Sequence, residues 1–252
     1  MTKVALIGLG KMGSELLTLL PEYDMACSLC CVRGAAHKGP FPILTSVQTL
    51  NPDMFDLAID FSSSQGLVER MTFFARSKKP VVLGTTGWDA DRENVLSLFK
   101  ENKTSMVWGA NFSLGMWIFR RALKALSKEL RLFPEFDIGL FEAHHRAKKD
   151  APSGTMIAIQ EDVLAEFPEK KVVHSSEEGA LPKDGLDVAT LRVGSVPGYH
   201  MAWIDGPDES IQISHSVRNR KTFARGALEA ATLLLKNPGV WHFHELMQRK
   251  EK

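Results

Sequence analysis

Short apolar runs alternate with amphipathic stretches through the first part of the chain. An apolar run of four to eight residues is typical of a buried strand, whereas apolar residues spaced three or four apart indicate a helix. Strands that alternate with helices predict a parallel sheet with helices on both faces and right-handed crossovers. The predicted strands are Val4–Ile7, Met25–Val32, Leu57–Asp60, Pro80–Leu83 and Ser105–Trp108, and the predicted helices are Ser14–Leu20, Gln65–Ser77 and Asp89–Lys100.

The pattern changes after Asn111, where strands begin to follow one another directly. Consecutive strands separated by turn residues predict an open mixed or antiparallel sheet. One face of such a sheet would be covered by helices, and the other could form an oligomer interface. A polar stretch with Gly179, Pro182 and Gly185 is predicted to be a loop. The helices are predicted at Leu114–Leu130, Ser153–Phe167 and Phe223–Lys236, and the strands at Phe136–Phe141, Ala189–Val193, His200–Asp205 and Ser210–His215.

These patterns predict a fold of the α/β class with two domains. Residues 1–112 together with 221–252 are expected to form a Rossmann-like, doubly wound parallel sheet that binds a dinucleotide. Residues 113–220 are expected to form a smaller α+β domain with an open mixed sheet, which would bind substrate and support oligomerisation.

Composition narrows the class of protein. The 252 residues are 44% hydrophobic and 24% charged, which is typical of a globular protein. The net charge of +1 provides no basic field for nucleic-acid binding. No apolar run reaches the length that spans a membrane. The first predicted strand begins near Lys3 and leaves no room for a signal peptide, so a cytoplasmic location is expected.

Three cysteines, Cys27, Cys30 and Cys31, fall within one apolar run. A Cys-x-x-Cys spacing is compatible with a redox or metal site, but no second cysteine pair completes a metal site. The alternative is that they are small core residues of a buried strand. On a regular strand, Cys27 and Cys31 would face one way and Cys30 the other.

A glycine motif follows the first predicted strand and precedes a helix. Gly8, Gly10 and Gly13 form the pattern G-x-G-x-x-G, which permits a tight turn, close approach of the backbone to a pyrophosphate, and tight helix packing. Glycine-rich turns also occur for purely structural reasons. At this position in a βαβ unit, the motif favours a dinucleotide. The predicted loop residues are Gly8, Leu9, Gly10, Lys11, Met12 and Gly13.

The end of the second predicted strand indicates which dinucleotide is bound. NAD-binding domains commonly carry an acidic residue there, which binds the ribose hydroxyl. This chain has Val32 followed by Arg33. An arginine suits a 2′-phosphate, although Arg33 could also be a solvated loop residue. We therefore expect NADPH as the preferred cofactor, with NADH as the alternative.

The segment EAHHRAKKDAPSGT, residues 142–155, carries the densest candidate chemistry. A helix-forming pattern follows it, so Ser153 is a suitable N-cap and the free backbone N–H groups at the helix start could hold an anion. His144 is a candidate proton donor and Lys148 a fixed positive charge beside that anion site. The segment predicts a site for a small anionic substrate that must be protonated. The alternative is a polar loop without chemistry; no metal is predicted, because adjacent histidines do not easily converge on one ion.

Two further motifs follow the fourth and fifth predicted strands. The carboxyl ends of parallel strands are where ligands bind in doubly wound sheets, although both motifs could be ordinary turns. The motifs are GTTG at residues 84–87 and GANFSLG at residues 109–115.

The chain resembles the dihydrodipicolinate reductases, enzymes of lysine and diaminopimelate synthesis that reduce a cyclic imine dicarboxylate. The segment 142–155 carries the resemblance most specifically, and further motifs extend it over nearly the whole chain. The family's glycine loop more often has an additional residue between its first two glycines, and an acidic residue often stands where Val32 is. The further motifs are Asp60–Ser62, Arg192–Gly194, Gly198–His200, the run from Glu209 to His215, and Arg220–Ala227.

The resemblance implies roles for individual residues. His144 would be the general acid, with Lys148 stabilising the charge that develops. His145, Gly154, Thr155 and the weaker candidate Arg220 would bind the dicarboxylate substrate. The family also implies a homotetramer built through the sheet of the second domain. The residues expected along the nicotinamide half of the cofactor are Gly84, Thr85, Thr86, Gly109, Ala110, Asn111 and Phe112.

Two other functions compete with this one. A different nicotinamide-dependent dehydrogenase, acting on an amino or hydroxy acid, would share the first domain but not Lys148 together with Ser153-Gly154-Thr155. A non-catalytic regulator that responds to a dinucleotide would need a DNA-binding or partner module, and the sequence contains neither a basic helix nor a helix-turn-helix pattern.

Overall fold

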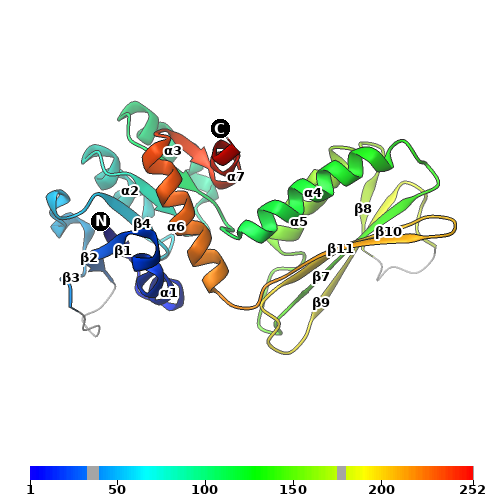
Figure 1. Ribbon diagram of the computed structural model, residues 1–252, viewed down its shortest axis with the longest axis horizontal. Helices are drawn as coiled ribbons and strands as arrows, with labels where there is room; N and C mark the ends of the chain where they lie inside the picture. The colour runs from blue at the N-terminus through cyan, green and yellow to red at the C-terminus, as the bar shows by residue number, and fades with distance from the viewer. Residues whose placement is uncertain (33–39, 175–179, 252) are drawn as a thin grey trace. The chain divides into compact units, whose positions relative to one another are not determined.

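The computed structural model describes residues 1–32, 40–174 and 180–251, and it divides into two compact units. Unit 1 comprises Met1–Ser113 and Arg220–Lys252, and unit 2 comprises Leu114–Asn219 (Figure 1). Unit 2 is thus an insertion into unit 1. Within the described residues, no helix is both long enough and apolar enough to cross a membrane.

Unit 1 is built on a parallel sheet of seven strands, as predicted for a doubly wound fold. The order is β12-β6-β5-β4-β1-β2-β3, and every pair of neighbours is parallel. The chain reverses its direction of winding at β1, so the loop after β1 lies at the switch point where such sheets bind ligands. The strands are β1 (Thr2–Ile7), β2 (Met25–Cys31), β3 (Ile43–Leu44), β4 (Leu57–Asp60), β5 (Val81–Leu83), β6 (Met106–Trp108) and β12 (Val240–His242).

Amphipathic helices cover both faces of this sheet. Ala5 and Ile7 of β1 pack with the buried side chains of α2 and α3, and the alternation of a strand places Val4 and Leu6 on the opposite face. Helices α1 and α6 pack against each other. The helices are α1 (Lys11–Leu19), α2 (Leu67–Arg76), α3 (Arg92–Glu101), α6 (Lys221–Lys236) and α7 (Phe243–Met247), with short 3-10 turns at Leu20–Tyr23, Val47–Thr49, Pro52–Met54, Asp89–Asp91 and Gln248–Glu251.

The strand β2 contains a bulge, which places Cys27 on the opposite face from the one predicted. Val4 pairs with Cys27, but the next residue, Ala5, pairs with Leu29, so Ser28 is an extra residue in β2. Such a bulge shifts the alternation of side chains by one position. Cys27 and Cys30 therefore share a face, and their Sγ atoms lie 3.6 Å apart. The prediction that Cys27 and Cys31 would lie on one face of the strand, with Cys30 on the other, was wrong.

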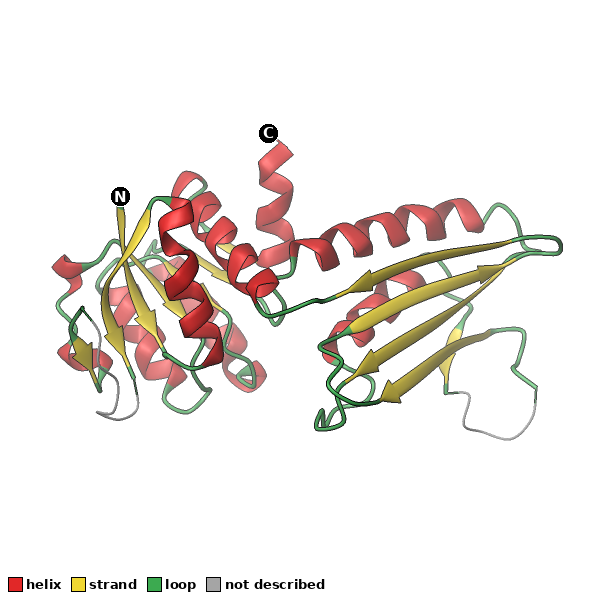
Figure 2. Ribbon diagram, turned by 60° about the horizontal axis from the view of Figure 1, so that its bottom comes forward, coloured by secondary structure: helices red, strands yellow, loops and turns green. Residues whose placement is uncertain are grey.

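Unit 2 is a five-stranded mixed sheet with two helices on one face (Figure 2). The order is β11-β10-β7-β9-β8; β10 is antiparallel to β7 and β11, whereas β9 is parallel to β7 and β8. Met116 and Phe119 of the first helix join Met156 and Ile159 of the second in a core against the sheet. The elements are α4 (Leu114–Leu130), β7 (Asp137–His144), α5 (Gly154–Leu164), β8 (Lys171–Val173), β9 (Gly185–Arg192), β10 (Tyr199–Asp205) and β11 (Ser210–Ser216).

Several boundaries in unit 2 differ from the prediction, and two of these differences extend the sheet. Strand β7 continues to His144, so the first three residues of the histidine-rich segment belong to the sheet. Strand β9 begins at Gly185, which was predicted to be a loop residue; it pairs there with Lys171 of β8. Gly185 and Asp187 are poor strand formers, so the sequence gives little signal for this part of the strand.

The other face of the unit 2 sheet carries an apolar group of side chains on β7, β9 and β10, whereas β11 contributes serine and glutamine residues to it. Phe141 of β7, Leu191 of β9 and Tyr199, Met201 and Trp203 of β10 alternate with the side chains that face the helices. The rings of Phe141 and Tyr199 lie 6.1 Å apart, and the side chain of Trp203 is 47% exposed. We call these five residues the open face of the sheet.

Candidate functional site

A buried carboxylate lies at the centre of the candidate site in unit 2. Glu142 of β7 is 0% exposed and points to the face covered by helices. Its Oε1 accepts hydrogen bonds from the Ser153 backbone N–H at 3.0 Å and from Arg192 Nη2 at 2.8 Å, and its Oε2 accepts one from Ser153 Oγ at 2.5 Å. Burial alone would raise the pKa of Glu142, but the hydrogen bonds from Ser153 and Arg192 outweigh it and lower that pKa. Glu142 is therefore a charged group that joins β7, β9 and the start of α5.

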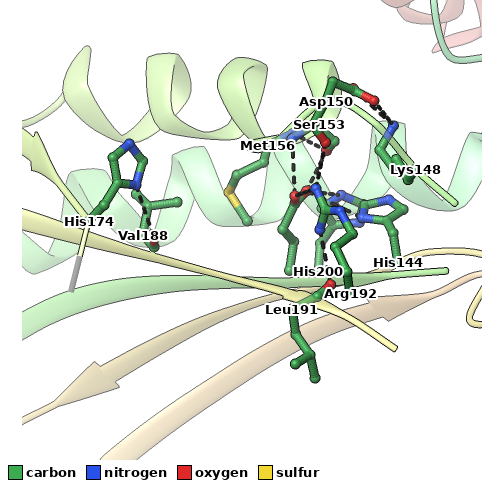
Figure 3. A network of polar contacts seen from close by, with 11 residues as sticks. His144, Lys148, Asp150, Ser153, Met156, His174, Val188, Leu191, Arg192 and His200 are labelled. Carbon is green, nitrogen blue, oxygen red and sulfur yellow. Dashed lines mark hydrogen bonds and ion pairs between the residues drawn. The ribbon is translucent and has the colours of Figure 1, made fainter. Parts of the chain in front are cut away.

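Two histidines flank this carboxylate. His144 Nδ1 lies 3.5 Å and His200 Nε2 3.6 Å from Glu142 Oε2, and the two rings meet edge to face with centroids 5.1 Å apart (Figure 3). Both side chains are almost fully buried. Burial lowers the pKa of His144 although Glu142 opposes it, and burial together with His144 lowers the pKa of His200 to about 4. Both rings are therefore neutral near pH 7 in the free protein.

The loop between β7 and α5 places a lysine beside the helix start. Lys148 Nζ forms an ion pair with the Asp150 carboxylate at 2.9 Å, and this contact with Lys148 lowers the pKa of Asp150 (Figure 3). Ser153 is the N-cap of α5, as predicted, and its hydroxyl accepts a hydrogen bond from the Met156 N–H at 3.1 Å. Gly154 is exposed, and a Cβ at this position would meet no atom within 4 Å. A hydrogen bond from the Gly154 backbone also lowers the pKa of Asp150, so the Asp150 carboxylate lies at the helix start where an anion is favoured.

The structure brings together only some of the residues predicted to bind substrate. His144, Lys148 and Gly154 belong to one strand, loop and helix start, and Thr155 follows in the first turn of α5. His145 is half-buried in the same loop. Arg220 is exposed at the N-cap of α6 and belongs to unit 1.

The site contains three residues for which no role was predicted: Glu142, Arg192 and His200. Each stood in a quoted motif, but their proximity arises from pairing between strands: His200 lies opposite Glu142, and Arg192 lies opposite His144. A second guanidinium contact extends the network, because Arg192 Nη2 also donates to the Asp150 carbonyl at 2.6 Å. Only the register of the sheet could have identified this group.

Glu142, His144 and His200 also have the side chains that a metal ion could use. Their potential ligand atoms all lie within 4.8 Å of one another. However, both oxygens of Glu142 already accept hydrogen bonds, one of them from the positively charged Arg192. A cation would compete directly with that guanidinium. We assign no metal to this cluster.

The glycine loop of unit 1 borders a cavity of about 510 Å³. Gly8 has a φ of +91° and donates its N–H to the Cys31 carbonyl at 2.8 Å. A Cβ on Gly13 would lie 2.1 Å from the Gly8 oxygen, whereas a Cβ on Gly10 would meet no atom within 4 Å. Gly13 is thus required for packing, and Gly10 leaves the space that a pyrophosphate needs. Residues lining the cavity include Gly8, Leu9, Gly10, Cys31, Val32, Ser46 and Ser62.

The other predicted cofactor residues lie in α1, in the loops after β5 and β6, and at Arg33. Lys11 and Met12 are in the first turn of α1, and Lys11 is exposed. Thr86 in the loop after β5 and Ala110 in the loop after β6 are also exposed. The remaining residues of those two loops are packed or hydrogen-bonded inside unit 1. Thr85 Oγ1 donates a hydrogen bond to Asp60, and Asn111 Oδ1 accepts one from the Ser113 N–H. Gly84 lies against the ring of Phe61 and Gly109 against that of Phe112, which is itself 1% exposed. Arg33 lies outside the described residues.

Comparison with known proteins identifies relatives over nearly the whole chain. The family model described as "Dihydrodipicolinate reductase, N-terminus" matches residues 2–112, and the corresponding C-terminal model matches residues 115–247. Proteins named 4-hydroxy-tetrahydrodipicolinate reductase from Xanthomonas campestris pv. campestris and Campylobacter concisus are 33% and 34% identical, with 94% and 93% of both chains covered.

Solved structures support the fold. A dihydrodipicolinate reductase from Paenisporosarcina sp. TG-14, described as bound to dipicolinate, matches with a TM-score of 0.78 at 22% identity, covering 96% of this chain and 97% of that one. An engineered D-amino acid dehydrogenase bound to NADP⁺ matches with a TM-score of 0.56 at 14% identity, covering 97% and 93%. At these identities the likeness concerns the fold.

We predict that Glu142→Gln lowers the free energy of unfolding by about 2–4 kcal/mol at neutral pH, because the change removes a buried charge and leaves Arg192 without its counter-ion. The folded state lowers the pKa of Glu142, so its stabilisation is present above its ordinary value of 4.5 and disappears as the pH falls through the folded value. Urea unfolding followed by circular dichroism should show the difference between the two proteins shrinking in acid.

The matched control is Glu161→Gln, which removes an exposed carboxylate from α5. It should change the unfolding free energy by less than about 0.5 kcal/mol. Equal stability of wild type and Glu142→Gln at neutral pH would contradict the central role of this carboxylate.

Proposed function

The chain belongs to the dihydrodipicolinate reductase family, and we propose that it reduces 4-hydroxy-tetrahydrodipicolinate, or its dehydrated form dihydrodipicolinate, to tetrahydrodipicolinate with NAD(P)H. This reaction would serve lysine and diaminopimelate synthesis. The observation that carries the proposal is the arrangement in unit 2. A buried histidine, a lysine and the start of α5 come together there on one strand, loop and helix.

The start of α5 and Lys148 would bind the substrate's carboxylates. The backbone N–H groups of Gly154 and Thr155 lie at the positive end of the helix dipole, where an anion is favoured. Lys148 is held by the exposed carboxylate of Asp150 in the free protein, so a substrate carboxylate could take the place of Asp150. His145 and Arg220 are further candidates for the same task, on the strength of the family resemblance.

His144 would supply the proton that the reduction needs. Hydride transfer is the chemistry that a bound nicotinamide cofactor supplies, and the protein must provide the proton at the adjacent carbon. Burial lowers the pKa of His144 in the free protein, but a dianionic substrate beside it would favour the imidazolium, as Glu142 already does. Lys148 would stabilise the negative charge that develops during the reaction.

We expect His144→Ala to lower kcat by two or more orders of magnitude, the size of effect that a general acid contributes. Oxidation of NADPH, followed by absorbance with enzymatically generated substrate, measures this. The control is His174→Ala, a histidine of the same unit whose Nδ1 contacts the Val188 carbonyl, and it should retain wild-type turnover. Full turnover in His144→Ala would assign the proton to Lys148 or to water.

The same assay separates the competing functions. A dinucleotide-responsive regulator would bind NADPH without any turnover of the substrate, and another dehydrogenase would turn over an amino or hydroxy acid instead. Pyridine-2,6-dicarboxylate is a planar mimic of the proposed substrate. It should raise the melting temperature only when NADPH is present if the reductase proposal holds.

The cofactor would bind at the glycine loop, which has the space for a pyrophosphate at Gly10. Residues of the loops after β5 and β6, from Gly84 to Thr86 and from Gly109 to Phe112, are proposed to follow the nicotinamide half. The Phe112 ring is buried between Phe61 and Phe243, so this residue would contribute through its backbone. NADPH is proposed as the preferred form, because Arg33 follows β2 where many NAD-binding domains have an acid.

Arg33→Ala should lower kcat/KM for NADPH by about tenfold and leave the value for NADH nearly unchanged, because only NADPH carries the 2′-phosphate. Arg76→Ala, at the exposed end of α2, is the control and should change neither value. An unchanged ratio of the two kcat/KM values would contradict the assignment of Arg33.

We also propose that the open face of the unit 2 sheet binds a second copy of the chain, as part of a homotetramer. Contiguous exposed apolar residues on a sheet mark an interaction surface. Leu191 and Trp203 are 46% and 47% exposed, and the neighbouring Phe141 and Met201 are half-buried on the same face.

Trp203→Glu would place a charge within that interface and is expected to convert the tetramer into smaller species in sedimentation velocity. The control is Ile118→Glu, which changes an apolar residue of α4 that is 59% exposed. A monomeric wild type, or a tetramer that survives Trp203→Glu, would contradict the proposed interface.

A further inference from the structure

The bulge in β2 brings two thiols together that a regular strand would separate. Cys27 pairs with Val4 and Cys30 pairs with Leu6, and residues two apart on the regular strand β1 point to the same face. The extra residue, Ser28, makes this register possible. As a result the two Sγ atoms are 3.6 Å apart, within about 2 Å of the separation in a disulfide.

We propose that Cys27 and Cys30 form a redox-active dithiol, which a peroxide oxidises to an intramolecular disulfide. This site lies in unit 1, in a strand of the parallel sheet, and does not depend on the reductase activity proposed for the chain. The third thiol, Cys31, points to the opposite face, where it packs in the core with Leu29 and Phe74.

The two thiols differ in exposure. Cys27 is partly exposed, whereas Cys30 is fully buried. Among the described residues, β3 pairs only with Cys30 and Cys31, so no strand pairs with β2 at Cys27 on the side away from β1. A small oxidant can therefore reach Cys27 more readily than Cys30.

The local interactions also differ in their effect on reactivity. The contact with Cys30 lowers the pKa of Cys27, whereas the same contact, together with burial, raises the pKa of Cys30. Because the thiolate is the reactive form, Cys27 is the nucleophile and Cys30 the resolving thiol.

The chemistry balances in two steps. The Cys27 thiolate attacks one oxygen of hydrogen peroxide, the O–O bond breaks, and Cys27 sulfenic acid and hydroxide form. The Cys30 sulfur then attacks the Cys27 sulfur; the S–S bond forms as the S–O bond breaks, and the proton of Cys30 leaves with the hydroxyl group as water. The two thiols lose two electrons, and the peroxide is reduced to water and hydroxide.

The experiment counts free thiols in the folded protein before and after hydrogen peroxide, by alkylation under denaturing conditions and intact mass. Wild type should fall from three alkylated thiols to one, and a reductant should restore all three. Cys31→Ser should fall from two to none, because it retains the pair. Cys27→Ala should retain both thiols as free or singly oxidised species, without a disulfide.

Cys30→Ala serves as a second variant, because it keeps the exposed Cys27 and removes its partner. It should accumulate sulfenic acid, which a dimedone probe labels, and form no intramolecular disulfide. Wild type that keeps three free thiols, a disulfide that requires Cys31, or oxidation that yields only cross-linked dimers would each overturn the proposal. None of these readouts depends on NADPH or on substrate, so they remain informative if the reductase assignment fails.

Discussion

The buried charge of Glu142 sets the arrangement of unit 2. A carboxylate without solvent must be fully paired, and this one is satisfied only if Arg192 on β9 and Ser153 at the start of α5 reach it together. One side chain thereby fixes the end of a strand pair relative to a helix start. His144 lies two residues along the same strand, so its distance from the helix N-terminus follows from the same contacts. His200 is buried beside the same carboxylate, and this burial keeps its ring neutral because no water is present to stabilise the charged form.

Much of the fold follows from the spacing of apolar residues. Leu114–Leu130 and Leu57–Asp60 were predicted with the bounds that the structure has, because long periodic helices and fully apolar runs give strong signals. The short strands β3, β8 and β12 were not predicted, because their residues are at most partly buried and form no distinct apolar run, unlike the equally short β5 and β6. Only their neighbours in the sheet define them. The bulge at Ser28 is a further case, since nothing in the local sequence marks an extra residue that depends on pairing with β1.

The candidate site likewise has a part that could be located from the sequence and a part that could not. The segment from His144 through Lys148 to the N-cap at Ser153 is contiguous, and it could be located because a loop that enters a helix has recognisable signals. The parts that come from other strands could not. His200 is far from Glu142 along the chain and becomes its neighbour only through the register of β10 on β7, and Arg192 does so through β9. A sequence motif can locate candidate groups that are contiguous in the chain, but the groups that set their electrostatic surroundings are found only from the pairing of the strands.

The insertion of unit 2 has a consequence for the order in which the protein is made. The ribosome synthesises β1 to β6 first, then all of Leu114–Asn219, and only afterwards α6 and β12. The parallel sheet of unit 1 cannot acquire its final edge strand, nor α1 its partner helix α6, until the inserted unit is complete. During synthesis, therefore, unit 2 can fold first, and unit 1 cannot complete its fold until its C-terminal segment has been made. The apolar side chains of α1 and β6 that α6 and β12 cover are exposed during that interval.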